Sequence, residues 1–390
     1  MELFEFKTIN ELCLKITDGA HFSPSEEQNG IYPMYSSKDM LYNGFDDKDV
    51  KMISKSDYDR LVKQDCRPLT DDILIIKDGN NYLKQVFKVK STLDAVILSS
   101  IAILRPNKKI IDPDYFTYVL RTESVRKAMA NYVSGAAIPR VVLKDFKKMK
   151  LKLHKDINAQ RHIASILSAY DNLIENNTRR ICLLEQMAEN LYKEWFVRFR
   201  FPGHEKAEFE NGLPKGWNKL PLLEICEFKR GKNITSEEMC DGNIPVISAG
   251  IDVSGYHSKA NVKGVSVTMS SSGANAGFIS IHYTDIWAAD CSYIEESTTP
   301  NIFYVYELLN NLRIVITNFQ RGAAQPHVYP KDINRIKLIV PDKALMEEAN
   351  NRFAAVHKEI FYLQQQSALL SRQRDLLLPR LMSGKLEVNV

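Results

Sequence analysis

The sequence predicts an α+β protein in which two β-rich domains are separated by two long helices that pair as an antiparallel coiled coil. Three observations predict this fold. Part of the chain recurs almost 190 residues downstream, each copy ends in a long apolar stripe at helical spacing, and short β-type runs with turn signals precede each stripe. A repeat of this length indicates two copies of one domain, related by a pseudo-two-fold, and not a solenoid.

The composition is that of a globular protein with more than one domain. The chain has 390 residues, of which 44% are hydrophobic and 26% charged, and its net charge is +4. These values exclude disorder along the whole chain, and the charge is too small to indicate a polyanionic partner by itself. Six cysteines without CxxC spacing indicate neither a disulfide framework nor a zinc ribbon. The acidic start MELFEFKTINELC does not fit a signal peptide, so we expect a cytoplasmic protein.

The repeat is clearest where residues 113–155 align with 300–342 without a gap, at a shift of 187. Thirteen of the 43 aligned positions are identical, and the best stretch pairs GAAIPRVVLKDFKKMKLKL with GAAQPHVYPKDINRIKLIV. Fainter echoes pair 29–37 with 241–249 and 71–79 with 265–273 at other shifts, which indicates insertions in surface loops. We therefore expect a first β-rich head at 1–155 and a second at 201–341.

Within the heads, short β-type runs alternate with turn signals such as Asp78-Gly79 and Asp241-Gly242. Each head is therefore expected to be mostly β. The predicted runs are 31–37, 72–79, 96–104 and 141–153 in the first head, and 243–250, 265–273, 278–283 and 333–340 in the second.

A long helix is predicted after each head, at 156–200 and within 342–390. Asp156 or Asn158 can cap the first helix, and Pro202-Gly203 follows its end; Asp342 caps the second, and Pro379 then Gly384 end it. The apolar stripes alternate steps of three and four residues, which is the seam of a coiled coil. They consist of Ile163, Ile166, Tyr170, Leu173, Leu184, Met187 and Leu191 in the first helix, and Met346, Ala349, Phe353, Val356, Ile360, Leu363, Leu370 and Leu377 in the second.

Chain order predicts that the two helices pair antiparallel, which would bring the second helix back to the first head. Four polar residues interrupt the apolar seam, and polar side chains in such a seam can fix its register. These are Asn177, Arg180, Ser367 and Arg374.

Motifs that would indicate catalysis are missing from the sequence. There is no Gly-rich loop ending in GK[ST], no pair of consecutive prolines as an amino-methyltransferase signature needs, and no metal-ligand spacing among the eight histidines. Two Glu-x-Lys triplets, Glu5-Phe6-Lys7 and Glu227-Phe228-Lys229, match half of a nuclease site, but such triplets arise easily by chance. We expect a protein without catalysis or a bound metal of its own.

Two similar heads on a helix pair suit the reading of two half-sites on duplex DNA. Loops near the repeated blocks carry cations, amides and hydroxyls, which suit phosphates and base edges. The candidate DNA-contacting residues are His21, Ser36, Ser37, Lys38, Lys77, Asn80, Asn81, Lys84 and Arg140 in the first copy, and Lys229, Arg230, Lys232, Asn233, Ser270, Ser271, Ser272, Asn275, Arg321, Gln325 and His327 in the second.

Four motifs give the chain a resemblance to a known family. NAQRHIASIL (158–167) opens the first long helix, LYKEWF (191–196) closes it, GLPKGW (212–217) begins the second head and LLPRLMSG (377–384) ends the second helix. With these motifs the chain resembles, over nearly its whole length, the DNA-specificity subunits of type I restriction–modification systems. It departs from them where the second helix begins, because PDKALMEEANNRF lacks the usual Pro-rich, Gln-Arg approach.

The resemblance implies that each head is a target-recognition domain and that the helices are spacers. The chain would read an asymmetric bipartite double-stranded DNA target and hold two modification subunits. Those subunits would bring S-adenosylmethionine and methylate DNA, usually at adenine, and restriction subunits with ATP and Mg could join them. Two other classes stay open at this point: a recognition domain fused to a methyltransferase or nuclease, and a coiled-coil scaffold without a role on DNA.

Overall fold

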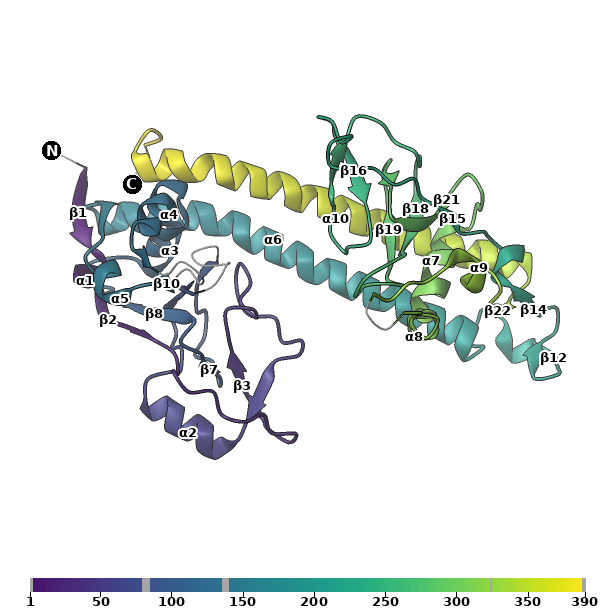
Figure 1. Ribbon diagram of the computed structural model, residues 1–390, viewed down its shortest axis with the longest axis horizontal. Helices are drawn as coiled ribbons and strands as arrows, with labels where there is room; N and C mark the ends of the chain where they lie inside the picture. Colours follow the sequence, from purple (N-terminus) through teal and green to yellow (C-terminus); the bar gives the residue numbers. More distant parts are fainter. Residues whose placement is uncertain (1–2, 79–84, 135–139, 323–324, 388–390) are drawn as a thin grey trace. The chain divides into compact units, whose positions relative to one another are not determined.

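The computed structural model describes residues 3–78, 85–134, 140–322 and 325–387, and the chain forms two compact units (Figure 1). Unit 1 comprises Met1–Ile174 and Ala368–Val390, and unit 2 comprises Glu175–Ser367. The units divide inside the two long helices, whereas the predicted borders after 155, 200 and 341 follow the ends of elements. That four-part division stays a prediction.

Unit 1 contains the first head, the first part of helix α6 and the last part of helix α10. Short strands dominate its head, and two helices, α3 and α4, cover one side. Its elements are β1 Phe4–Thr8, α1 Ile9–Leu12, β2 Cys13–Asp18, β3 Tyr32–Tyr35, β4 Lys51–Ile53, α2 Lys55–Lys63, β5 Ile73–Ile76, β6 Val86–Lys88, β7 Val96–Ile97, β8 Ile101–Pro106, α3 Pro113–Arg121, α4 Glu123–Ala130, β9 Val133–Ser134, β10 Arg140–Val141, α5 Leu143–Phe146, β11 Lys150–His154 and α6 Ile157–Tyr192.

Unit 2 contains the second head together with the remaining parts of α6 and α10. A π-helical turn, Lys193–Val197, extends α6, and two 3-10 turns lie at His204–Lys206 and Leu222–Glu224. Its other elements are β12 Phe209–Glu210, β13 Leu213–Pro214, β14 Asn218–Pro221, β15 Lys229–Arg230, β16 Ile244–Ile247, β17 Gly255–His257, β18 Ser266–Ser270, β19 Ile279–His282, β20 Trp287–Ala288, β21 Cys291–Glu295, α7 Ile302–Asn311, α8 Arg313–Thr317, α9 Pro330–Ile333, β22 Lys337–Val340 and α10 Lys343–Ser383.

The two heads have the same sheet topology, which confirms the internal repeat and the predicted fold class. A four-stranded sheet has the order β2-β8-β5-β6 in unit 1 and β15-β21-β18-β19 in unit 2. A three-stranded sheet has the order β4-β3-β7 in one and β17-β16-β20 in the other, with the parallel pair β3/β7 matched by β16/β20. The antiparallel pair β1/β11 corresponds to β14/β22, whose second strands begin at Lys150 and Lys337, at the predicted shift of 187.

Strand β5 shows why the centre of the head in unit 1 is apolar on both sides. All four of its residues, Ile73 to Ile76, are buried, and successive side chains of a strand point to opposite faces. Ile73 and Ile75 join the core under α3 and the helix pair, whereas Leu74 and Ile76 join a second core on the other face of the sheet. The sheet therefore lies between two apolar layers, which fix it against the helices.

Helices α6 and α10 run antiparallel within each unit. In unit 1, Ile163 and Leu167 of α6 share a core with Leu381 and Met382 of α10; in unit 2, Asn177 of α6 contacts Ser367. The N-terminal strand meets the end of α10, since a Cβ atom added at Gly384 would lie 2.7 Å from the Phe4 ring.

The helix ends agree with the predicted caps except at one residue. Oδ1 of Asp156 accepts from the amide of Asn158 at 2.9 Å, and Oδ1 of Asp342 accepts from Leu345 at 3.0 Å. The prediction that Pro379 begins the end of the second helix is wrong, because α10 continues through it to Ser383. Gly384, with φ of 75°, ends the helix, since the left-handed region that terminates helices suits glycine.

The continuous β run predicted at 141–153 is also wrong in its middle. Residues Leu143–Phe146 form the helical turn α5 between β10 and β11, and α9 stands at the equivalent place before β22. Phe146 at the end of this turn is buried in the core of unit 1. The apolar residues of this segment therefore reach the core from a helical turn, in which apolar and polar residues need not alternate as they do in a strand.

Acidification is expected to destabilise unit 2 through His282 at the end of β19. Its Nε2 lies 2.8 Å from the Thr268 hydroxyl, and burial lowers the pKa of His282 to about 4. The folded state thus binds fewer protons than the unfolded state between about pH 6.5 and 4, so stability falls as the pH drops through this window. Urea denaturation at several pH values should show this decline, and His282→Gln should flatten it. An unchanged pH profile in the variant would contradict the assignment.

Candidate nucleic-acid interface

Two of the predicted DNA-contacting residues, Arg140 and His327, occupy equivalent places in the two units. In unit 1 the chain leaving β5 meets the start of β10 at a bridge between Asp78 and Arg140. In unit 2 the chain leaving β18 meets the equivalent segment at a bridge between Ser272 and His327. The repeated segments 71–79/265–273 and 113–155/300–342, which align at different shifts, therefore lie side by side in both units. The site that they form carries different side chains in each copy.

A glycine in each unit lets a candidate loop cross close to the three-stranded sheet. The Ala20 amide, one residue after Gly19, donates to the Ile97 carbonyl at 2.8 Å, and the Lys232 amide after Gly231 donates to the Ala288 carbonyl at 2.9 Å. A Cβ atom at Gly19 would lie 2.1 Å from the Ile97 oxygen, and one at Gly231 would lie 2.4 Å from the Ala289 oxygen. Any other residue would push away the loops that carry His21 in one unit and Lys232 and Asn233 in the other.

In unit 1, two carboxylates hold the candidate cations. The Lys77 ammonium is buried and lies 3.0 Å from Asp18 and 3.4 Å from Asp78. Asp18 also lies 3.2 Å from Nε2 of His21, and Asp78 lies 3.3 Å from Nε of Arg140. Because the side chains of His21 and Arg140 are 68% and 50% exposed, these two can reach a ligand, whereas Lys77 acts inside the head.

The serine-lysine segment after β3 has one exposed side chain. The Ser36 hydroxyl donates to Asp39 at 2.8 Å, and the Ser37 amide donates to the Ser100 hydroxyl at 3.1 Å. Lys38 is 71% exposed and reaches only to 3.9 Å from Asp39. The candidates Asn80, Asn81 and Lys84 lie outside the described residues.

In unit 2, five of the candidates line one cavity of about 520 Å³. Asp290 also lines it, and its carboxylate accepts from the Ser272 hydroxyl at 2.7 Å and lies 3.7 Å from the Arg230 guanidinium. The cavity thus holds a guanidinium, amide groups and the carboxylates of Asp290 and Glu238, which suit guanine, adenine and cytosine edges respectively. The five candidates are Arg230, Asn233, Ser272, Gln325 and His327.

The other candidates of unit 2 divide into exposed and internal side chains. Lys229 pairs with Glu295 at 3.1 Å and Arg321 with Asp332 at 2.9 Å, and both cations remain substantially exposed, as does Lys232. Ser270 and Ser271 are buried, and their hydroxyls contact the Ala249 carbonyl and the Ser292 hydroxyl. Asn275 is half-buried in the turn before β19, where its carbonyl accepts from the Phe278 amide.

The polar interruptions of the helix seam each find a partner within their own unit. In unit 2, Nδ2 of Asn177 donates to Gln366 at 2.8 Å and to Ser367 at 3.2 Å, and Arg180 pairs with Glu359 at 2.7 Å. In unit 1, Arg374 pairs with Asp171 at 2.5 Å. These contacts match opposite positions of an antiparallel pair, and the register role of the four residues stays a prediction.

Sequence reasoning missed the acidic residues that organise these sites: Asp18, Asp78, Asp171 and Asp290. Their signal was weak, because a lone aspartate in a loop or on a helix is usually solvated. Asp18 is the last residue of β2 and directly precedes Gly19. A glycine directly after a strand is the one local feature of the sequence that could have indicated a role for Asp18.

Two absences hold for the described parts of the chain. Among residues 3–78, 85–134, 140–322 and 325–387, no cluster of three or more His, Cys, Asp or Glu side chains is arranged to hold a metal ion. Across the same ranges, no helix combines the length and apolar character needed to cross a membrane.

Comparison with known proteins identifies the family. The family model described as "Type I restriction modification DNA specificity domain" matches residues 1–186 and 214–351, which is most of the chain and one match in each repeat. The chain belongs to the type I restriction–modification DNA specificity family. The predicted family resemblance is confirmed.

Relatives of this specificity-family chain include two from Methanocaldococcus jannaschii. The MjaIX specificity subunit is 25% identical over 70% of this chain and 69% of its own length, and the MjaVIII specificity subunit is 28% identical over 56% and 48%. The match therefore spans only about half of the second relative. A solved type I S subunit from M. genitalium has the same fold, with a TM-score of 0.63 and 19% identity, covering 99% of this chain and 97% of that one.

Proposed function

We propose that this chain is the DNA-reading subunit of a type I restriction–modification complex and that each head reads one half of a bipartite, gapped target. The repeated site carries the proposal. One backbone arrangement presents Asp78 and Arg140 in unit 1 but Ser272 and His327 in unit 2. Similar scaffolds with different donors and acceptors suit two different base sequences, since base edges are distinguished by their hydrogen-bonding groups.

The side chains available in unit 2 suit direct reading of bases in a groove. Arg230 can donate to guanine O6 and N7, Asn233 or Gln325 can bond both N6 and N7 of adenine, and Asp290 can accept from cytosine N4. In unit 1, His21 and Arg140 are the exposed candidates near the equivalent place. Exposed cations such as Lys38 and Lys232 suit phosphates, which position a protein on DNA without reading sequence.

We also propose which other subunits this chain binds. Membership of the specificity family supports a chain that works with other subunits of the system. We infer that it holds two modification subunits, that these bind S-adenosylmethionine and methylate the target, and that this chain contributes recognition and no catalytic group. Restriction subunits with ATP and Mg would join the same assembly.

The test is methylome sequencing of a host that expresses the modification subunit with and without this chain. A bipartite, gapped methylated motif should appear only when the chain is present. Arg230→Ala and Gln325→Ala together should then change or relax one half of the motif and leave the other half intact. Lys343→Ala, which removes an 88% exposed lysine at the start of α10, is the matched control and should leave the motif unchanged. Methylation of the same motif without the chain would contradict the proposal.

A further inference from the structure

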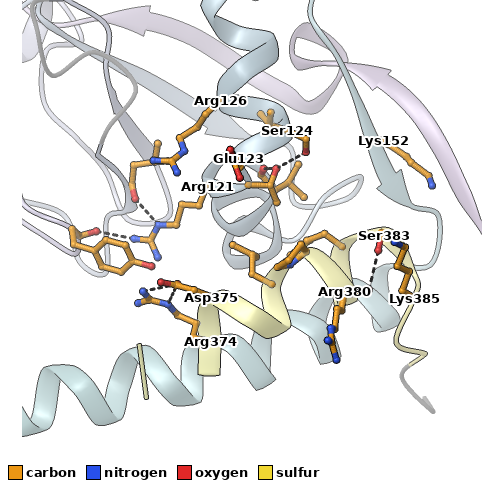
Figure 2. Close-up of a pocket in the computed structure, with 18 of the residues that line it drawn as sticks. Arg121, Glu123, Ser124, Arg126, Lys152, Arg374, Asp375, Arg380, Ser383 and Lys385 are labelled. Atoms are coloured by element: carbon orange, nitrogen blue, oxygen red, sulfur yellow. Dashed lines mark hydrogen bonds and ion pairs between the residues drawn. The ribbon is translucent and has the colours of Figure 1, made fainter. Parts of the chain in front are cut away.

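A large cleft in unit 1 lies outside the candidate reading site. It has a volume of about 1280 Å³ and lies between the α3–α4 region of the head, strand β11 and the last turns of α10 (Figure 2). Six basic side chains line it against two acidic ones. This excess of positive charge is large for a chain whose net charge is only +4.

The acidic residues of the cleft are already paired, and so are two of its arginines. Glu123 pairs with Lys127 at 2.7 Å and Asp375 with Arg374 at 2.8 Å. Arg374 also contacts Asp171, the same carboxylate that lies 3.0 Å from Arg121. Both carboxylates of the cleft therefore have a cationic partner, and neither is paired with the other four cations.

Four further cations line the cleft without a carboxylate partner among the described residues: Arg126, Lys152, Arg380 and Lys385. The Lys152 ammonium lies 4.3 Å from the centre of the Phe4 ring, which attracts a cation but does not neutralise it. Cations that face a common cleft repel one another unless an anion lies between them. The arrangement is therefore that of an anion site.

The cations are spread along the cleft and do not converge on one point. In Figure 2, Arg126 projects from α4 on one side, whereas Lys152 of β11 and Lys385 beyond α10 lie on the other. The first turn of α4 also lines the cleft, and Thr122 leaves it uncapped because its hydroxyl donates to the Val119 carbonyl at 2.7 Å. The positive end of this helix dipole adds to the field. An extended polyanion fits this pattern better than a single small anion.

We propose that this cleft binds phosphates of the DNA backbone beside the half-site that unit 1 reads; the inference rests on the proposed function. Continuity with the reading loops favours DNA over an acidic peptide. Gln85 lines the cleft, and its carbonyl accepts from the amide of Ile76 at 3.3 Å, one residue before the candidate Lys77. The α4 helix on the other wall leads towards Arg140 through β9. The cleft thus adds affinity that does not depend on base sequence.

The test is the salt dependence of DNA binding by the full chain assembled with its modification subunit. The probe is a fluorescent duplex carrying the motif found by methylome sequencing. The variant Arg126→Gln/Lys152→Gln/Lys385→Gln should make the slope of log K against log salt shallower by about 2–3, since each lost phosphate contact changes it by about 0.9. Affinity at moderate salt should fall roughly 10- to 100-fold, with the methylated motif unchanged.

The control Lys55→Gln/Lys63→Gln/Lys109→Gln removes the same charge from exposed lysines elsewhere in unit 1 and should keep the wild-type slope. A cleft variant with the wild-type slope would overturn the cleft site while leaving the proposed function intact. Loss of the modification subunit with an unchanged DNA slope would also overturn it and indicate an acidic protein segment as the occupant. No DNA binding by the wild-type complex would overturn both proposals. Single substitutions and thermal melting check that the triple variant is folded.

Discussion

Replacing Asp171 with alanine is expected to lower the unfolding free energy of unit 1 by about 3–5 kcal/mol, the usual cost of removing one partner from a buried ion pair. Asp171 lies on α6, and its side chain is only 8% exposed. The Arg121 and Arg374 side chains on either side are 9% and 10% exposed. Without the carboxylate, two guanidinium groups would face each other in a largely buried site.

Asp171 links three helices and a loop of unit 1. It accepts from Tyr118 at 2.7 Å and Arg121 at 3.0 Å, both on α3, and from Arg374 on α10 at 2.5 Å. Burial, together with the Asp171 carboxylate, raises the pKa of Tyr118, so its hydroxyl stays protonated and donates. Both guanidinium groups lie over the Tyr42 ring, at 3.9 and 4.6 Å from its centre. One carboxylate therefore fixes the head and the β3–β4 loop to the helix pair.

The measurement is hydrogen–deuterium exchange along the chain combined with urea denaturation. In Asp171→Ala, peptides from α3 and from residues 368–383 should lose protection, whereas peptides of unit 2 should keep theirs. Asp375→Ala is the matched control, because Asp375 also pairs with Arg374 but its side chain is 64% exposed. Its loss should cost at most about 1 kcal/mol, as for other exposed ion pairs. Equal effects of the two substitutions would show that burial does not determine the strength of this contact.

The helices and the repeat could be predicted from the sequence because their signals are local or regular. An aspartate before a helical stripe, as at Asp342, determines a cap within three residues. Strands β11 and β22 align at the fixed shift of 187 because neither copy has an insertion within the aligned segments 113–155 and 300–342. Pro379 was misjudged because tertiary packing of Leu378, Leu381 and Met382 against the core of unit 1 offsets the hydrogen bond that a proline removes.

The site could be predicted only in outline. Residue type selected candidates such as Arg230 and His327, whose role stays a prediction, but it could not distinguish the buried Lys77 from the exposed Lys38. That difference depends on Asp18, 59 positions from Lys77 in the sequence and brought beside it by the four-stranded sheet. The buried contacts of Asp171 could not be predicted for the same reason, because its partner Arg374 is 203 residues away in the sequence. Contacts between distant segments leave no periodic signal in a single sequence.

Unit 2 has a different buried network where its head meets the helices, centred on His357 of α10. Its Nε2 lies 2.8 Å from Glu307 of α7, and its Nδ1 lies 2.9 Å from the Tyr283 hydroxyl. The His357 and Glu307 side chains are 2% and 3% exposed. Burial raises the pKa of Tyr283, so its hydroxyl keeps its proton and can donate to Nδ1 of His357. The two heads are thus fixed to the helix pair by unrelated chemistry, a carboxylate between arginines in one and an imidazole in the other.

Replacing His357 with leucine is expected to cost unit 2 about 3–5 kcal/mol, because Glu307 would be left buried without its donor. The double variant His357→Leu/Glu307→Leu should recover most of that loss, since apolar residues in place of a buried pair are often neutral or stabilising. Lys358→Leu changes the neighbouring exposed residue and should have little effect. Urea denaturation of the double variant and of both single variants, His357→Leu and Glu307→Leu, gives the coupling energy between His357 and Glu307. Additive losses in the double variant would mean that the two residues stabilise unit 2 independently, through packing rather than through their contact.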